Sequence, residues 1–186
     1  MGIKNSIKHF LFLGLIFIAS KTFGQAASGI GLAYGPSKPL SGDYKLSSGV
    51  QLFSDIAISS RWEIVPNIGV EALDSKGRVY VVNPYYSRHI EDIGMIYAGA
   101  SAKYNFSRNI FVKAGPMLFI GAGGDDISAG GIGGTAAAGY NLNLDEHSTL
   151  ELSVFTSVVN IEKVGNGITA VAGLKLGYVF NFSRRK

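Results

Sequence analysis

The chain has 186 residues, of which 47% are hydrophobic and 16% charged, with a formal net charge of +4, 25 glycines and no cysteine. The lack of cysteine excludes disulfides and lipid attachment at a cysteine. The length suffices for one domain, and no segment beyond the N-terminal region has the 18 or more consecutive apolar residues that indicate a membrane-spanning helix.

The first 24 residues have the pattern of a secretory signal peptide. Lys4 and Lys8 precede an apolar run from Phe10 to Ala19, and small residues follow it. This run is shorter than the roughly 20 residues that a helix needs to cross a bilayer. We therefore expect residues 1–24 to be a signal peptide that is cleaved before Gln25.

The predicted mature domain, residues 25–186, is nearly neutral. Removal of the signal peptide takes away Lys4, Lys8 and Lys21 of the 17 basic residues and none of the 13 acidic ones, which leaves 14 against 13. The basic character of the whole chain thus belongs mostly to the export signal. Net charge gives no reason to expect nucleic acid as a partner.

Short segments in which apolar and polar residues alternate recur along the mature domain, and helical spacing with capping residues does not. The sequence therefore predicts an all-β fold of eight strands. In chain order the predicted strands are residues 28–35, 48–58, 62–73, 94–106, 110–121, 130–144, 149–160 and 168–182.

The connections between these strands alternate in length. The links at 59–61, 107–109 and 145–148 are tight turns rich in Ser, Asn and Asp. Longer links are expected at residues 36–47, 74–93, 122–129 and 161–167. Short turns at one end and long loops at the other are typical of an antiparallel up-and-down transmembrane β-barrel. Within the longest link, Val79 to Val82 is expected to extend a hairpin beyond the membrane.

The final strand illustrates the two faces of the predicted sheet. Leu174, Leu176 and Tyr178 share one face, and Lys175 and Gly177 share the other. A soluble β-sandwich alternates in the same way. The strand length of ten or more residues favours a membrane barrel, because strands in soluble sheets average about five to six residues and a tilted strand needs about 9–11 to cross a bilayer.

The charged residues of the strands all lie on the small or polar face, where opposite charges can pair inside a narrow barrel. We expect them to form a lumen network that holds the barrel shut and sets its register, without a catalytic role. One such charge on the lipid face would cost about 2–4 kcal/mol at the bilayer midplane. The predicted network consists of Asp55, Glu63, Glu71, Lys103, Lys113, Glu151 and Lys175.

Aromatic residues gather near strand ends, as in the girdles that flank the apolar band of membrane barrels. Tyr34 and Tyr97 are expected to lie at the interface near the long loops. The residues expected in the girdle near the tight turns are Trp62, Tyr104, Phe106, Tyr140, Tyr178, Phe180 and Phe182.

One five-residue pattern occurs twice, as Tyr104 to Arg108 and as Phe180 to Arg184. With these features the sequence resembles the small eight-stranded outer-membrane β-barrel proteins of Gram-negative bacteria, the OmpA transmembrane-domain type and related "porin family" barrel domains. The resemblance implies an outer-membrane location, contact with outer-membrane lipid, and handling by periplasmic chaperones and the barrel-assembly machinery. It also implies that Phe182 serves as the aromatic of the assembly signal, although four residues follow it.

Three weaker motifs suggest other chemistry. Residues 131–136 match G-x-G-x-x-A, with Glu151 twenty residues after the first glycine, but a dinucleotide site needs a helix after the glycines and a strand is predicted there. His147 beside Ser148 hints at a hydrolase, although neighbours in one turn need not converge. Loop residues that invite a metal or surface ligand are His89, Glu91, Asp92, Asp125 and Asp126, and Arg78, Tyr80, Tyr85, Tyr86 and Arg88.

These loop groups do not form a full ligand set at a recognisable spacing. We therefore expect no metal, cofactor or catalytic site. The sequence favours an outer-membrane barrel with a lumen filled by side chains and a structural or surface-interaction role. A small pore or transporter with a water-lined lumen is the alternative, and an outer-membrane lipid-modifying enzyme is a third possibility.

Overall fold

A computed structural model of the chain describes residues 28–40, 42–77, 79–83, 86–89, 92–123, 127–160 and 168–182. The predicted signal peptide lies outside these residues. The described part is all-β, and it contains no helix long and apolar enough to span a bilayer. The strands are β1 Ser28–Pro39, β2 Ser47–Ala57, β3 Trp62–Leu73, β4 Val79–Asn83, β5 Tyr86–His89, β6 Ile93–Asn105, β7 Ile110–Gly123, β8 Ile127–Asn143, β9 Ser148–Asn160 and β10 Ile168–Asn181.

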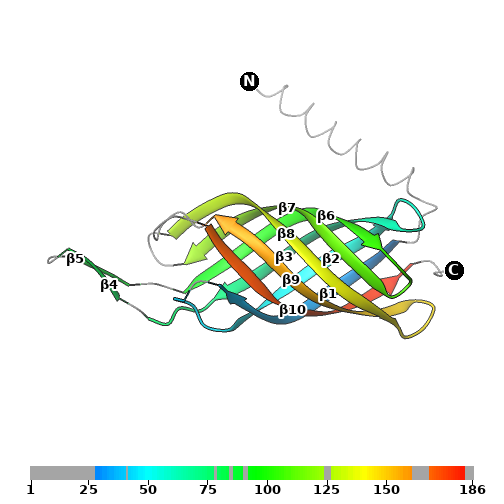
Figure 1. Cartoon of the computed structure of the whole chain (residues 1–186), viewed down its shortest axis with the longest axis horizontal. Helices are drawn as coiled ribbons and strands as arrows, with labels where there is room; N and C mark the ends of the chain where they lie inside the picture. Colours follow the sequence, from blue (N-terminus) through cyan, green and yellow to red (C-terminus); the bar gives the residue numbers. More distant parts are fainter. Residues whose placement is uncertain are drawn as a thin grey trace, which may run out of the picture.

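Eight of these strands close into one antiparallel barrel (Figure 1). The order around the barrel is β1-β10-β9-β8-β7-β6-β3-β2, so each strand pairs with its neighbours along the chain and β1 closes onto β10. Gly29 of β1 pairs with Asn181 of β10, and Pro39 with Val171. Closure leaves the barrel without an open sheet edge, which hydrocarbon surroundings would not tolerate.

The tight turns lie at one end of the barrel, which we call the turn end. Backbone hydrogen bonds close each turn: the Ile58 N–H donates to the Trp62 carbonyl at 2.8 Å, and the Phe106 N–H to the Ile110 carbonyl at 2.9 Å. Ser59 Oγ accepts a further hydrogen bond from the Trp62 N–H at 3.1 Å. Hydroxyl groups in these turns thus satisfy backbone donors that the sheet leaves open.

The opposite end, the loop end, carries the longer connections. The hairpin of β4 and β5 projects there as a separate two-stranded sheet (Figure 1), and a strand was expected at this point. Two predicted links were too long, however. β1 continues to Pro39, four residues into the predicted link 36–47. β7 continues to Gly123 and β8 already begins at Ile127, so most of the predicted link 122–129 is strand. These residues are mostly small, polar or proline and carry little hydrophobic alternation, which hid the strand pattern.

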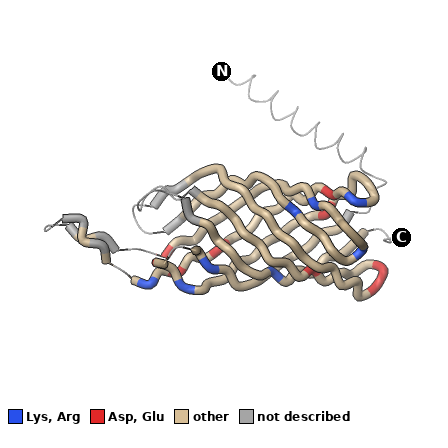
Figure 2. Tube along the Cα trace, viewed as in Figure 1, with Lys and Arg blue, Asp and Glu red and all other residues tan. Residues whose placement is uncertain are grey.

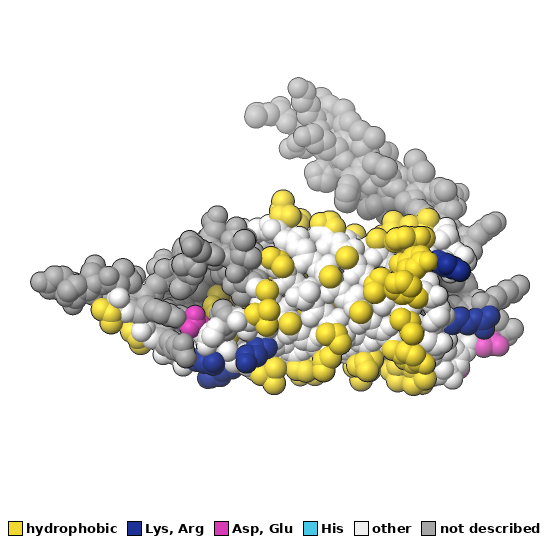
Figure 3. Space-filling view, in the orientation of Figure 1, with side chains coloured by type: hydrophobic (Ala, Val, Ile, Leu, Met, Phe, Trp, Pro, Cys, Tyr) yellow, Lys and Arg dark blue, Asp and Glu magenta, His cyan; other side chains and the backbone are white. Residues whose placement is uncertain are grey.

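Inward and outward residues alternate along the barrel strands, and the large apolar side chains of the lipid-facing parity point outward. Leu32, Ile68 and Leu176 are about half exposed, at 56%, 52% and 56%. Apolar side chains are prominent on the face seen in Figure 3, and they gather especially near the turn end. A band of this kind around a closed barrel identifies lipid as its surroundings.

Candidate functional site: the lumen

The lumen near the turn end holds a cluster of buried charges, which we call the turn-end cluster. Lys103 Nζ lies 3.1 Å from Asp55 Oδ2, 3.3 Å from Glu63 Oε2 and 3.1 Å from Glu151 Oε2. Lys113 Nζ lies 2.6 Å from Glu151 Oε1. Lys103 is only 1% exposed. The cluster therefore joins β2, β3, β6, β7 and β9 through paired charges, and Figure 2 shows basic and acidic positions side by side at this end.

Strand register explains why these charges meet. Glu63 of β3 is the direct partner of Lys103 of β6, and Lys103 is in turn the partner of Lys113 of β7. Directly opposed side chains in antiparallel strands have Cβ atoms about 4.5–5.5 Å apart. The two lysines would repel each other at this spacing, and Glu151, which contacts both, offsets that repulsion.

A second, smaller group lies nearer the loop end. Lys175 Nζ donates a hydrogen bond to the Tyr97 hydroxyl at 2.7 Å and lies 3.5 Å from Glu71 Oε2. Glu71 lies against Gly49, its cross-strand partner, where any side chain would overlap the carboxylate. All seven charged residues named from the sequence thus lie inside the barrel, divided between two groups.

Aromatic rings stack beside the lysines of both groups. Lys103 Nζ lies 4.6 Å from the Phe111 ring centre. Lys113 Nζ lies 5.1 Å from the Phe53 ring, and Lys175 Nζ lies 4.3 Å from the Phe155 ring. An ammonium over an aromatic face is attracted by the ring quadrupole, and more strongly when both groups are desolvated.

Each of these rings lies over a glycine of the neighbouring strand. A Cβ on Gly31 would overlap the Phe53 ring, and a Cβ on Gly69 would overlap the Tyr97 ring. The cross-strand pairs are Gly31 with Phe53, Gly69 with Tyr97, Gly139 with Phe111, and Gly173 with Phe155, and the Phe119 ring lies over Gly133, two residues from its cross-strand partner Gly131. The sequence prediction missed this arrangement. Large aromatic side chains occur on the lumen face, where only small or polar residues were expected. The glycine opposite each ring on the neighbouring strand is the sequence signal that would have identified it.

The loop end of the lumen is closed by apolar side chains, which we call the apolar plug. Tyr44, from the connection between β1 and β2, is 7% exposed and packs into this plug. Burial, together with the carboxylates of Asp43 and Asp92, raises the pKa of Tyr44. The plug consists of Tyr44, Leu73, Ile93, Met95, Tyr97, Met117, Phe119, Phe155, Val159 and Val171.

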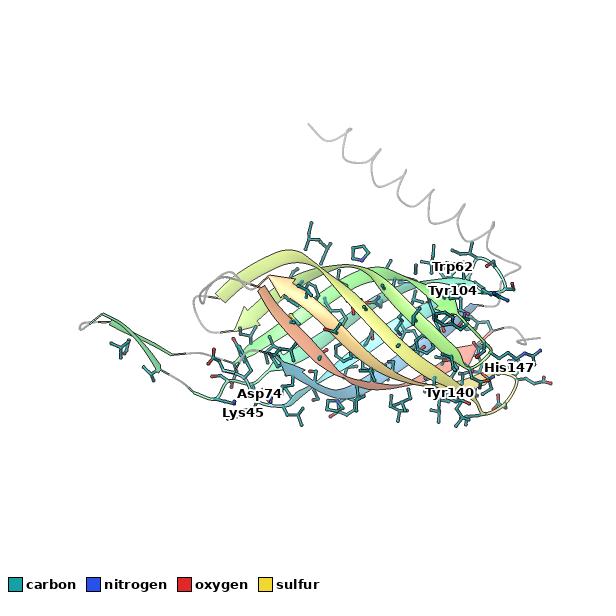
Figure 4. The ribbon with its side chains drawn as sticks, in the orientation of Figure 1. Lys45, Trp62, Asp74, Tyr104, Tyr140 and His147 are labelled. Atoms are coloured by element: carbon teal, nitrogen blue, oxygen red, sulfur yellow. The ribbon has the colours of Figure 1, made fainter. Side chains whose placement is uncertain are left out.

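The segment that carries Tyr44 is fastened to the link after β3. Lys45 N–H donates to the Asp74 carbonyl at 2.7 Å, and Ser47 Oγ donates to Asp74 Oδ2 at 3.1 Å. Lys76 Nζ donates to the Gly42 carbonyl at 2.8 Å. Figure 4 shows Lys45 and Asp74 next to each other at the loop end. These bonds hold Tyr44 over the barrel mouth.

A cavity of about 30 Å³ lies in the lumen, lined by members of both charged groups and of the plug, among them Glu71, Lys113 and Met117. A water molecule needs roughly 10–15 Å³ of such space and two to four polar partners. The cavity therefore has room for a few water molecules, and side chains fill the lumen around it.

The aromatic residues named as a girdle lie on the outside at the turn end. Trp62 and Tyr104 have ring centres 4.9 Å apart, and those of Phe180 and Phe182 are 5.9 Å apart. Tyr104, Tyr140 and Trp62 are visible at this end in Figure 4. The prediction for Tyr97 was wrong. Its side chain is 4% exposed and points into the lumen, because it fills the space over Gly69.

The catalytic motifs do not form sites. The glycine motif at 131–136 lies within strand β8, without the helix that a dinucleotide site needs. His147 Nδ1 lies 3.1 Å from the Asn181 carbonyl, its ring stacks on Phe180, and Ser148 Oγ lies 2.9 Å from the Tyr178 hydroxyl. His147 and Ser148 thus fasten the last turn to β10. The two side chains are not hydrogen-bonded to each other.

The loop candidates are only partly placed. Asp92 Oδ1 accepts a hydrogen bond from the Ser75 N–H at 2.7 Å. Among the described residues, no three His, Asp or Glu side chains converge to hold a metal ion. Glu91, Asp125, Asp126, Arg78 and Tyr85 lie outside the described residues, as do the side chains of Tyr80, Tyr86, Arg88 and His89.

A closed eight-stranded barrel with an apolar outer band and an ion-paired interior defines the class of outer-membrane β-barrel proteins. No family model matches the sequence, and no curated protein matches it. Solved structures do match. Neisserial surface protein A (NspA) is 15% identical with a TM-score of 0.59, over 84% of this chain and 96% of that chain.

Two further outer-membrane proteins have the same fold. OprG from Pseudomonas aeruginosa is 12% identical with a TM-score of 0.53, over 85% of this chain and 97% of that chain. AlkL, determined in DMPC lipid bilayers, is 14% identical with a TM-score of 0.53, over 87% of this chain and 92% of that chain. At these identities the likeness establishes the fold of small outer-membrane barrels and no particular activity.

Proposed function

We propose that the protein is an integral barrel of a Gram-negative outer membrane, exported by its signal peptide, with a closed lumen and a structural or surface-interaction role. We expect the turn end at the periplasmic face and the loop end at the cell surface, because membrane barrels have short periplasmic turns and longer extracellular loops. The apolar outer band and the likeness to outer-membrane proteins support this location.

The observation that carries the closed-lumen proposal is that two different kinds of barrier lie in series along the barrel. At the turn end, Lys103 is surrounded by three carboxylates and 1% exposed, so its charge is used in pairing. At the loop end, the plug is apolar apart from the hydroxyls of Tyr44 and Tyr97, so it cannot replace the hydration shell of an ion, whose desolvation costs several kcal/mol or more. The ion pairs also tie five strands in one register.

Single-channel recording in planar bilayers tests this proposal. We expect no steady conductance from the purified protein, and none from Lys103→Gln or Glu151→Gln, because the apolar plug persists in both. Insertion of the protein is checked in the same bilayers by protease protection of the barrel. A steady native conductance that either substitution alters would contradict the closed lumen.

A gated pore is the second candidate, because one wall of the plug comes from a loop. Tyr44 lies on the segment between β1 and β2, and its neighbours Lys45 and Gly42 are hydrogen-bonded to Asp74 and Lys76. If this segment moved, the polar cavity beneath it would be reached from the surface. Steady conductance from Tyr44→Ala, with the native protein silent, would support such a pathway.

The surface-interaction role is supported by the hairpin of β4 and β5, which extends beyond the barrel (Figure 1). Val79 and Val81 on it are 48% and 76% exposed.

Lipid, periplasmic chaperones and the barrel-assembly machinery are the proposed partners. We expect Phe182→Ala to slow assembly into the outer membrane, and Phe106→Ala, at the same end of the barrel just after β6, to serve as its control.

We propose no enzymatic role and no cofactor. His147 and Ser148, the residues that suggested lipid modification, are engaged in contacts with β10, and the turn end lies away from the outer leaflet. Loss of a lipid modification in a His147→Ala strain would contradict this.

A further inference from the structure

An apolar groove of about 730 Å³ lies on the outer wall of the barrel, across β6 to β10. Its floor is a continuous row of cross-strand partners with small side chains, one from each strand. The row runs through Ala102, Ala114, Ala136, Thr156 and Ala172. Because the strands are tilted in a membrane barrel, a row of this kind crosses the wall obliquely.

Larger side chains border this floor. On the turn-end side the neighbouring row contains Trp62, Tyr104, Val112 and Val154, which also line the groove. On the loop-end side, the next cross-strand pair, Pro116 with Gly134, adds no large side chain, and Leu118 and Ile132, one pair further, stand out at 59% and 75% exposure. The groove therefore results from a change in side-chain size between rows of one sheet. In hydrocarbon the space must be filled by an acyl chain or by another protein, since its lining has few polar groups.

An exposed cation lies beside the turn end of the groove. Arg61, in the turn before β3, donates from Nη1 to the Tyr104 hydroxyl at 3.3 Å, and Tyr104 lines the groove. The centres of the Trp62 and Tyr104 rings are 4.9 Å apart and their planes are tilted by 56°, and Figure 4 shows both residues at the turn end. Aromatic rings of this kind lie at the headgroup level of a bilayer, and a guanidinium binds phosphate oxygens through paired N–H donors.

We propose that this groove binds one anionic glycerophospholipid, with an acyl chain along the small-residue floor and its phosphate on Arg61. This inference rests on the proposed function, in which the barrel spans a bilayer and the turn end faces the periplasm. The leaflet at that face is the phospholipid leaflet. A second copy of the chain fits less well, because a symmetric pair meeting at this groove would bring the two Arg61 side chains close together.

Native mass spectrometry of the full folded chain, titrated with dioleoyl phosphatidylglycerol in detergent, tests the proposal. We expect one lipid to be retained per chain. The double substitution Ala114→Leu and Ala136→Leu fills the groove from the lipid side, and we expect it to weaken binding about tenfold, as for the loss of roughly two buried methylene groups. We expect Arg61→Gln to weaken binding about fivefold, as for one basic residue at an anionic lipid surface, and to remove its salt dependence.

Two controls match these variants. Ala98→Leu makes one such exchange on the outer face of β6 but lies outside the groove lining, and Lys45→Gln removes a charge at the loop end. Both should bind lipid as the native chain does. Equal binding by the groove-filled and native chains, or equal losses in Ala98→Leu and the groove-filled chain, would overturn the proposal. If the native chain forms a lipid-free dimer and the groove-filled chain does not, the groove binds a second copy of the chain. That result would also overturn the lipid proposal.

The outcomes separate this inference from the proposed function. A barrel that inserts in bilayers and migrates differently on gels with and without boiling, yet retains no lipid, would refute the lipid site alone. A chain that neither inserts nor changes its migration would refute the membrane location first. If the groove-filled chain does not fold, the comparison of Arg61→Gln with Lys45→Gln still decides the matter.

Discussion

Lys175 of β10 donates a hydrogen bond across the lumen to the Tyr97 hydroxyl of β6, with 2.7 Å between Nζ and the phenolic oxygen. The two residues are 78 positions apart in sequence, and neither strand pairs with the other in the sheet. The bond therefore spans the barrel interior and links walls that backbone hydrogen bonds do not join.

Removal of the phenolic oxygen tests the value of this bond. We expect Tyr97→Phe to lower the free energy of unfolding by about 1–3 kcal/mol, because the buried ammonium loses an acceptor and keeps its desolvation cost. Denaturant unfolding in detergent micelles, followed by the fluorescence of Trp62, the single tryptophan of the chain, measures the change. Tyr140→Phe removes an outward hydroxyl and should be nearly neutral. Equal effects would contradict a bridging role for Tyr97.

The turn-end cluster gives a larger effect. We expect Lys103→Gln to destabilise the barrel by about 3–5 kcal/mol, because three buried carboxylates lose their shared partner. Equilibrium unfolding in micelles again measures the loss, with the exposed Lys45→Gln as the control. A loss of less than about 1 kcal/mol in the free energy of unfolding would mean that Lys103 does not hold the carboxylates. The cluster would then not set the register of the strands.

The glycine and aromatic pairs predict a coupled effect at Gly31 and Phe53. A Cβ on Gly31 meets the Phe53 ring, so we expect Gly31→Ala to cost about 1–3 kcal/mol through overpacking. Phe53→Leu should relieve part of this cost, and the double-mutant cycle should show that the two changes are not additive. Gly42→Ala is the control, because a Cβ there meets nothing within 4 Å. Additive effects would show that the ring does not rest on Gly31.

Depth in the bilayer predicts a contrast between two outward leucines. Leu176 lies within β10 and Leu144 lies just beyond β8, and they are 56% and 52% exposed. We expect Leu176→Arg to cost about 2–4 kcal/mol and Leu144→Arg about 0–1 kcal/mol, since a charge is tolerated near the interface. Yield in the membrane fraction and unfolding in lipid vesicles measure both. Equal tolerance would show that Leu176 does not face hydrocarbon.

The last tight turn predicts a pH dependence. The His147 N–H donates to Asp145 Oδ1 at 2.7 Å, and this backbone hydrogen bond is the main reason why the pKa of Asp145 lies below its ordinary value. A lowered pKa in the folded state means that the bond stabilises the turn above pH ~4, the unfolded value, and that stability is lost as pH falls through the folded pKa.

Asp145→Asn should therefore flatten the pH dependence of unfolding below about pH 4, the unfolded value. Glu146→Gln, one residue along, removes a carboxylate without removing the Asp145 bond and serves as the control. An unchanged profile in Asp145→Asn, or an equal change in Glu146→Gln, would show that the Asp145 bond does not set the acid stability of this turn.

Much of this structure was predicted from local pattern. Alternation in β10 fixed which face Leu176 and Lys175 would take, because side chains on a strand point alternately to opposite sides. The order of short and long links gave the eight-stranded antiparallel barrel. The pairing of inward aromatics with glycines was missed, because it depends on another strand: Phe53 lies over Gly31, and Phe155 lies over Gly173.

The sequence by itself determined the all-β class, the barrel and the face of each strand charge, since these depend on the period of two and on turn chemistry within short segments. Only the tertiary structure decided which charges meet, where Tyr44 closes the lumen and how the alanines of β6, β7 and β8 align into one groove. These features depend on strand register, which a single strand does not specify until its neighbours and the closure of β1 onto β10 fix it.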